Sequence, residues 1–118
     1  DEDTILIVHF AGQFPLWLAP VQVKLLTVTE KYSDYALTIA QQFEEAGLRA
    51  EADIRNEKIG YKLREARNER NPYICIIGEK EVEGDYLTVR NNKTGEQFEI
   101  KPDELQENLL KEIAEKAI

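Results

Sequence analysis

The segment Tyr-Ile-Cys-Ile-Ile-Gly at residues 73–78 is almost continuously apolar. A strand with one face in water alternates apolar and polar residues, whereas a strand covered on both faces is apolar at nearly every position. We therefore expect residues 73–78 to form the central strand of a sheet that has helices on both sides. Such a sheet is typical of layered α/β domains.

The first half of the chain alternates between strand and helix patterns. Val21–Val28 and Leu48–Asp53 are short apolar runs that favour strands. Between them, apolar residues recur at three- and four-residue steps over residues 35–46, which predicts an amphipathic helix. Ser33 is placed to cap the start of this helix, and Gly47 suits the left-handed position after its end.

The second half adds a helix, a hairpin and a last helix. Asn56 is placed to cap a helix whose apolar positions fall within residues 59–66. Residues 86–90 and 97–100 flank a stretch of turn-forming residues and predict a hairpin. Pro102 starts the last helix, because a first helical turn tolerates proline.

The predicted order is β-α-β-α-β-β-β-α, an α/β sandwich around a mixed sheet of about five strands and three helices. Residues 5–10 also have a strand composition, but Gly12, Pro15 and Pro20 punctuate the next segment of the chain and predict a connector there. The sequence contains no internal repeat and no low-complexity tract.

The composition excludes several classes of protein. The 118 residues carry 23 acidic and 15 basic side chains, a formal charge of −8, which indicates one small acidic domain. Bulk charge therefore argues against indiscriminate binding of DNA, RNA or membranes, and any nucleic-acid contact has to be local. No apolar stretch approaches the roughly 20 residues that span a bilayer, so we expect a soluble, cytoplasmic protein. The absence of methionine and the start at Asp1 suggest a fragment, a processed chain or an engineered sequence.

The sequence holds few residues that could carry out catalysis or bind a metal. The only histidine, His9, is far in sequence from the only cysteine, Cys75, which lies inside a predicted core strand. One histidine and one cysteine cannot supply the usual zinc ligands, and no glycine-rich loop joins a strand to a helix. We therefore expect no catalytic residues, no metal and no cofactor, and an enzyme ranks third among the possible functions.

Charge is unevenly distributed along the chain. Residues 58–70 hold five basic and two acidic side chains, a local charge of +3. Arg64, Arg67 and Arg70 follow one another at three-residue steps, so on a helix they form a ridge that could meet phosphates. The alternative is an ordinary solvated face in which Glu57, Glu65 and Glu69 neutralise these arginines.

Several strings resemble the anticodon-binding domain of threonyl-tRNA synthetases. They are Phe-Pro-Leu-Trp-Leu-Ala-Pro-Val-Gln-Val at 14–23, Asp-Ile-Arg-Asn-Glu-Lys-Ile-Gly-Tyr-Lys-Leu-Arg-Glu at 53–65, Pro72-Tyr73, Gly-Glu-Lys-Glu-Val-Glu at 78–83, and Val89-Arg90. The resemblance covers roughly residues 9–118. It divides the chain into a leading segment, residues 1–13, whose origin the sequence leaves open, and an anticodon-binding domain, residues 14–118.

The resemblance implies a three-layer α/β/α fold and a noncatalytic module that docks the anticodon loop of a tRNA. Aminoacylation with ATP would belong to the catalytic domain of the parent threonine–tRNA ligase, and neither DNA nor a membrane is an expected partner. By motif, the family positions that contact anticodon nucleotides fall on Asn56, Arg64, Arg70, Glu81 and Arg90. Glu81 and Arg90 would read a base, whereas Arg64, Arg70 and also Lys62 would hold phosphates or stack.

Structural roles compete with these assignments. Asn56 could simply cap its helix, Trp17 favours the core over base stacking, and Tyr61 is a weaker stacking candidate. The chain also departs from the family at Val8-His9, and at Asn68-Glu69 and Asn91-Asn92, where less basic residues should weaken RNA binding. The rival hypothesis is an engineered or divergent scaffold or protein-interaction domain that keeps the fold and has lost tRNA binding. Clustering of the five site residues on one face would favour RNA recognition.

Overall fold

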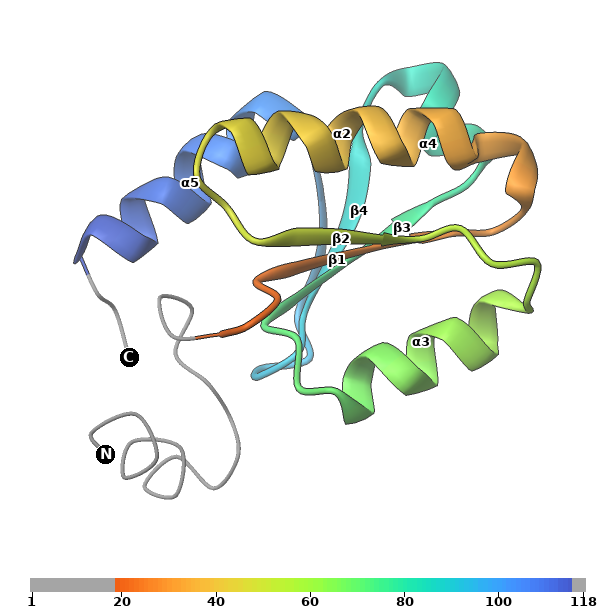
Figure 1. The fold of residues 1–118 in the computed structure, drawn as a ribbon, viewed down its shortest axis with the longest axis horizontal. Coiled ribbons are helices and arrows are strands. Elements are labelled where there is room, and N and C mark those ends of the chain that lie inside the picture. The colour runs from red at the N-terminus through yellow and green to blue at the C-terminus, as the bar shows by residue number, and fades with distance from the viewer. Residues whose placement is uncertain (1–18, 116–118) are drawn as a thin grey trace.

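The computed structural model describes residues 19–115, which fold into one five-stranded sheet with helices on both faces (Figure 1). In chain order the elements are β1 (Val23–Thr27), the 3-10 helix η2 (Glu30–Tyr32), α2 (Ser33–Glu45), β2 (Ala50–Asp53), α3 (Ile59–Asn68), β3 (Tyr73–Ile77), α4 (Glu79–Gly84), β4 (Leu87–Asn91), β5 (Gln97–Ile100) and α5 (Pro102–Glu115). The strand order in the sheet is β2-β1-β3-β4-β5.

The sheet is mixed, as predicted. β1 pairs in parallel with β2 on one side and β3 on the other, while β4 and β5 continue the sheet in antiparallel order. β3 is therefore the central strand, which confirms the interpretation of residues 73–78. The predicted hairpin is also confirmed, with Leu87 opposite Ile100 and Arg90 opposite Gln97.

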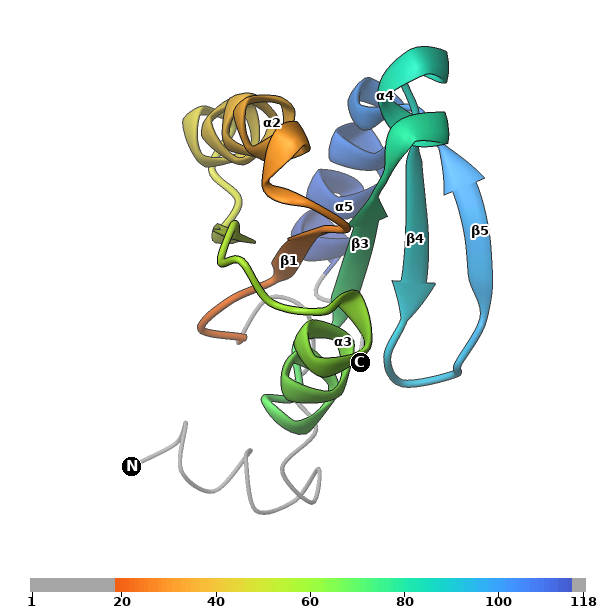
Figure 2. The ribbon, with the colours of Figure 1, turned by 90° about the vertical axis from the view of Figure 1, so that its right-hand side faces the viewer.

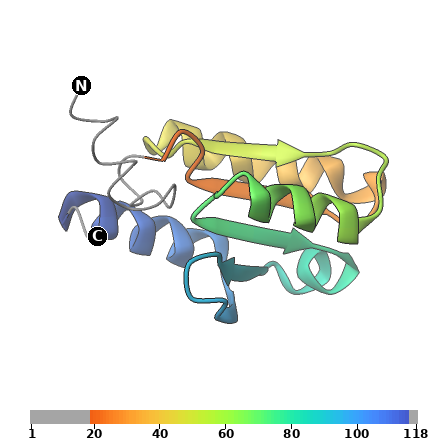
Figure 3. The same cartoon turned by 90° about the horizontal axis from the view of Figure 1, so that it is seen from below.

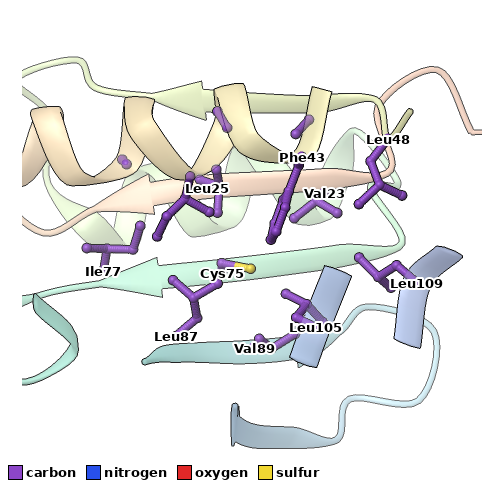
Figure 4. Packing of buried hydrophobic residues seen from close by; sticks show 14 residues of the cluster. Val23, Leu25, Phe43, Leu48, Cys75, Ile77, Leu87, Val89, Leu105 and Leu109 are labelled. Carbon is purple, nitrogen blue, oxygen red and sulfur yellow. The ribbon is translucent and has the colours of Figure 1, made fainter. Parts of the chain in front are cut away.

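One face of the sheet is covered by α2 and α5 over a large apolar core (Figure 4). Phe43 from α2, Leu105 and Leu109 from α5 and Leu25 from β1 are fully buried there. Cys75 of β3 lies in the same core, where burial raises the pKa of its thiol. Cys75 thus lies in the core strand predicted for it, where a buried neutral thiol is a poor nucleophile.

Among the described residues, α3 is the one helix on the other face, where it lies over β1 and β3 (Figure 3). Its apolar core is small and contains Leu26, Ala66 and Ile74 as buried residues, with Ile59 and Leu63 packed around them. The chain therefore has the expected three layers, with α2 and α5 above the sheet and α3 below it (Figures 1 and 2).

The helix boundaries correct several details of the prediction. Four α-helices occur within residues 19–115 where three were expected, because the short α4 follows β3 directly. Ser33 does not cap α2: Tyr32 holds the cap position, and the Ser33 hydroxyl donates to the carbonyl of Glu30 at 2.7 Å. Gly47 has a φ of +101°, which confirms the left-handed position expected after α2.

Asn56 does not cap α3 either. The cap position of α3 is held by Lys58, whose side chain makes no capping hydrogen bond. The predicted strand at residues 5–10, His9 and Trp17 lie outside the described residues. Across the described part of the chain, no helix is long and apolar enough to cross a membrane.

Candidate nucleic-acid interface

The two flanks of α3 differ in whether their charged side chains form ion pairs. On the flank that faces β2, Arg55 donates to Asp53 through Nε at 2.9 Å and through Nη2 at 2.7 Å, and it also donates to Glu65. Hydrogen bonds from Arg55 hold the pKa of both carboxyl groups below their usual values. We call this flank, which carries Asp53, Arg55, Glu65 and Glu69, the paired flank.

Lys24 extends the paired flank toward the start of the sheet. Its Nζ lies 2.5 Å from a carboxylate oxygen of Glu51 and 3.6 Å from one of Glu69. Glu65 and Glu69 are thus both bonded to cations that lie outside α3. The hypothesis that these two glutamates neutralise the arginines of α3 is therefore wrong.

The opposite flank is basic and has no acidic partner. Five side chains line a concavity of about 450 Å³ there, three of them arginines and two of them asparagines: Arg64, Arg67, Asn68, Arg70 and Asn92. Within residues 19–115, none of these arginines forms an ion pair. We call this surface the arginine concavity.

The β4–β5 turn forms one wall of the arginine concavity. Asn92 donates through Nδ2 to the backbone carbonyl of Arg67 at 3.3 Å, which fastens the turn to the last turn of α3. The backbone N–H of Asn92 donates to the carbonyl of Pro72 at 2.9 Å. These bonds join the turn to residues 25 and 20 positions earlier in the sequence, which form one surface with it.

Arg70 is held in a left-handed backbone conformation. Its φ is +65°, and its N–H donates to the carbonyl of Arg67 at 3.2 Å just after α3 ends. Glycine is the usual residue at this position of a helix terminus, and a side chain there costs about 1–2 kcal/mol. Arg70 therefore lines the arginine concavity at a cost in stability, and it also borders the hollow lined by Lys24 and Glu69.

Arg90 lies on the side of the sheet that α3 covers. In β4 it pairs with Ile74, which belongs to the core beneath α3. Because side chains alternate along a strand, Thr88 points to the same side as Arg90. The Nε of Arg90 is buried and has no hydrogen-bond partner in the part of the chain that the structure describes.

Glu81 belongs to α4, and its side chain is held against the other end of β4. Its Oε1 accepts from the N–H of Gly78 at 2.7 Å and its Oε2 from the hydroxyl of Thr88 at 2.9 Å. The residue is only 9% exposed. Along β4, Arg90 is two residue steps, about 7 Å, from Thr88, the residue that bonds Glu81.

The structure places four of the five residues expected at the site on the α3 side of the sheet, in two separate pairs. Arg64 and Arg70 share the arginine concavity. Arg90 belongs to β4, and Glu81 of α4 reaches the same side of that strand through its bond to Thr88. Asn56 is exposed in the loop before α3, at the other end of that helix from Arg70.

Lys62 is not available to RNA, contrary to the expectation that it holds a phosphate. It is fully buried, and its Nζ donates to the carbonyl and hydroxyl of Thr27 at 3.0 and 3.1 Å and to the carbonyl of Asp53 at 3.2 Å. Burial lowers the pKa of Lys62. Lys62 therefore fastens α3 to the ends of β1 and β2.

Tyr61 lies on the paired flank. It is about half exposed, and the guanidinium of Arg55 lies 5.8 Å from the centre of its ring. The tyrosine is thus engaged beside Arg55 and is not among the residues that line the arginine concavity.

Sequence reasoning did not assign two of the residues that line the concavity, Asn68 and Asn92, and it named Arg67 only as part of a ridge that could meet phosphates. The three-residue spacing from Arg64 was a usable signal for Arg67. No sequence signal was available for Asn92, because its place depends on a contact between the β4–β5 turn and α3. Among the described residues, no group of three histidine, cysteine or acidic side chains could hold a metal ion.

Known proteins resemble this chain in both sequence and structure. The family described as "Anticodon binding domain" matches residues 19–112. A threonine–tRNA ligase from Clostridium botulinum (strain Eklund 17B / Type B) is 51% identical over 112 residues, which cover 95% of this chain and 17% of the ligase. A threonine–tRNA ligase from Caldanaerobacter subterraneus is 48% identical over 114 residues, which cover 97% of this chain and 18% of the ligase.

A solved structure supports the same assignment. The crystal structure of the RNA binding domain of threonyl-tRNA synthetase from Cryptosporidium parvum Iowa II matches with a TM-score of 0.87 and 27% identity. The match covers 91% of this chain and 27% of that one. This chain spans less than a fifth of the length of the two bacterial ligases. It therefore belongs to the anticodon-binding domain family, in the form that matches threonine–tRNA ligases.

Proposed function

We propose that this domain binds the anticodon stem-loop of a threonine tRNA. The observation that carries the proposal is the arginine concavity, a surface with three arginines and no carboxylate in a protein of net charge −8. An acidic protein repels RNA at long range, so binding requires a local positive surface. The paired flank of α3 shows that other cations of this region are already neutralised.

Base recognition would fall to Arg90 and Glu81. A guanidinium donates to the oxygen and nitrogen acceptors of a base edge, and a carboxylate accepts from the N–H groups of guanine. Each oxygen of Glu81 already accepts one hydrogen bond, and each keeps a second lone pair for a base. Arg90 is partly exposed, and because its Nε is buried, the base would meet the terminal amino groups of its guanidinium.

Asn56, Arg64 and Arg70 complete the proposed site. Arg64 and Arg70 would bind phosphates from the arginine concavity, and Asn56 would offer its amide to a nucleotide at the start of α3. The exposure of all three side chains supports these roles.

We further propose that the domain catalyses no reaction and uses no cofactor of its own. The attachment of threonine to tRNA would then depend on the catalytic part of a longer ligase, which is the expected protein partner. A cytoplasmic location, with neither DNA nor a membrane as partner, is part of this proposal.

The test is fluorescence anisotropy with two labelled RNA stem-loops, one with a threonine anticodon and one with its second and third bases exchanged. We expect tighter binding to the threonine stem-loop. In Arg90→Ala this preference should fall by about 1–3 kcal/mol, or roughly 5- to 150-fold. Lys111→Ala removes an exposed charge from α5, on the opposite face of the sheet, and should change neither value.

Two outcomes would contradict the proposal. Absent binding at low salt would favour the rival hypothesis of a scaffold that has lost tRNA binding. Equal binding of both stem-loops, unchanged in Arg90→Ala, would show that the domain does not read the anticodon.

A further inference from the structure

The arginine concavity is distinct in composition from the proposed base-reading residues. Its lining contains Arg64, Arg67, Asn68, Arg70 and Asn92, and no apolar or acidic side chain. Bases in RNA are commonly stacked on an aromatic side chain, and no aromatic residue lines the concavity. The concavity thus provides three positively charged guanidinium groups and two neutral amide groups.

We propose that the arginine concavity is a subsite for the RNA phosphate backbone, and that Arg67, Asn68 and Asn92 belong to it. The inference rests on the proposed function and deepens it, because it separates backbone binding from base reading. Guanidinium groups match phosphate oxygens with two parallel hydrogen bonds, and amide groups of asparagine are common phosphate donors.

The geometry of α3 supports a role for Arg67 beside Arg64. Residues three apart on a helix are neighbours on its surface and differ by about 4.5 Å along the axis. Arg70 then continues the row beyond the end of the helix, in its left-handed conformation. The three arginines are thus successive neighbours on the surface, and together they line the arginine concavity.

The retained strain at Arg70 is a second, independent observation. Backbone strain of this kind persists where the surrounding structure enforces it and is concentrated at functional sites. The Arg70 N–H bond to Arg67 and the buried amide of Asn71, which donates to Ala66 at 3.2 Å, enforce it here. Arg70 thus lines the arginine concavity in a conformation that costs stability.

An acidic protein segment is a less suitable occupant. Protein interfaces usually have an apolar centre surrounded by polar residues, and the concavity has no apolar lining residue. The observations therefore favour a phosphodiester backbone over an acidic peptide.

The first test compares Arg67→Gln with wild type and with Lys111→Gln, which removes one exposed charge from α5. The threonine stem-loop and the stem-loop with exchanged bases are both titrated from 50 to 200 mM salt. In Arg67→Gln we expect both RNAs to bind more weakly by the same factor. The slope of log affinity against log salt should fall by about 0.7, which corresponds to roughly a 2.6-fold smaller salt effect over this range. Arg67→Lys should restore the slope, because it restores the charge.

A second pair of variants adds a negative charge instead. Asn68→Asp places a carboxylate in the arginine concavity, and Asn108→Asp places one on the exposed side of α5. Neither asparagine side chain makes a hydrogen bond in the described structure. We expect Asn68→Asp, but not Asn108→Asp, to weaken the binding of both RNAs. Thermal unfolding of each variant checks that the fold is unchanged.

Three results would overturn the inference. Arg67→Gln could match wild type in affinity and slope, or it could weaken only the threonine stem-loop, which would make Arg67 a base reader. Polyglutamate could displace the RNA more effectively than an unlabelled stem-loop of equal charge, which would favour an acidic protein partner. If wild type binds both stem-loops equally and Arg67→Gln still lowers the slope, the backbone subsite stands while anticodon recognition fails.

Discussion

The two faces of the sheet are covered by layers of different construction. On the side of α2 and α5, fourteen buried residues form one continuous apolar core, and Phe43 at its centre is fully buried. On the side of α3, the buried apolar cluster has three residues, and a buried lysine supplies three hydrogen bonds to the sheet. Four of the five proposed RNA-binding residues lie on the α3 side.

This difference indicates a division of roles. Apolar burial is the dominant stabilising force, so the α2–α5 side supplies most of the stability of the domain. The α3 side buries less and instead carries charged groups on its surface, some paired and some unpaired. Variants on the two sides should therefore separate stability from RNA binding.

The largest effect is expected for Phe43→Ala in the α2–α5 core. Removal of a large buried aromatic side chain costs about 3–5 kcal/mol, because apolar contacts are lost and a cavity remains. Urea denaturation followed by circular dichroism measures this loss. The affinity of the remaining folded protein for RNA should not change, and a loss below about 1 kcal/mol would show that the core repacks around the site.

Lys62→Ala should destabilise the α3 layer by about 3 kcal/mol, because the buried acceptors of Thr27 and Asp53 lose their donor. Lys62→Met retains most of the apolar stem and should cost less. Hydrogen exchange distinguishes Lys62→Ala from Phe43→Ala. In Lys62→Ala, the amides of α3 should lose protection before those of α2. Equal loss of protection in both helices would mean that the two layers unfold together.

Asp53→Asn tests the paired flank, with an expected cost of about 1–2 kcal/mol at pH 7, because the bonds from Arg55 lose their charge. Arg55 lowers the pKa of Asp53 below its ordinary value of 3.8. The stabilisation is therefore present above about pH 4 and is lost as the pH falls through the lowered pKa. Thermal unfolding of both proteins from pH 7 to pH 2.5 should show the difference between them shrinking in acid. A constant difference would rule out a charge-dependent bond.

The smallest effect is expected for Arg70→Gly, and it has the opposite sign. Glycine relieves the left-handed strain, so the free energy of unfolding should rise by about 1 kcal/mol. RNA affinity should fall at the same time, because a guanidinium of the arginine concavity is lost. Arg70→Ala serves as the control, since it removes the charge and keeps the strain. If both variants have the same stability, the conformation at residue 70 carries no cost.

Periodicity alone located most of the fold. The six-residue apolar run indicated β3 and its central place, and the three- and four-residue spacing indicated α2 to within a few residues. Pro102 marked the start of α5. These signals are local, because burial of a strand or helix face follows directly from the repeat of the element. The short α4 was missed because Glu79–Gly84 contains a single large apolar residue, Val82. Its first turn depends on the bond from Gly78 to Glu81.

The site was predicted less completely than the fold. The family resemblance pointed to Asn56, Arg64, Arg70, Glu81 and Arg90, and the structure places four of them on one side of the sheet. Lys62 looked equivalent to the nearby arginines in sequence, yet it is fully buried. Asn92 was interpreted as a departure that weakens RNA binding, whereas the structure places it in the wall of the arginine concavity.

The sequence by itself determined the layered α/β fold, the family and the local excess of positive charge in residues 58–70. Only the tertiary structure decided how that charge is used. Glu65 and Glu69 lie within the same segment as the arginines, but they pair with Arg55 and Lys24 on the other flank of α3. The physical reason is that periodicity acts between neighbours in sequence, whereas an ion pair forms between whichever charges the packing of helix on sheet brings within a few ångströms.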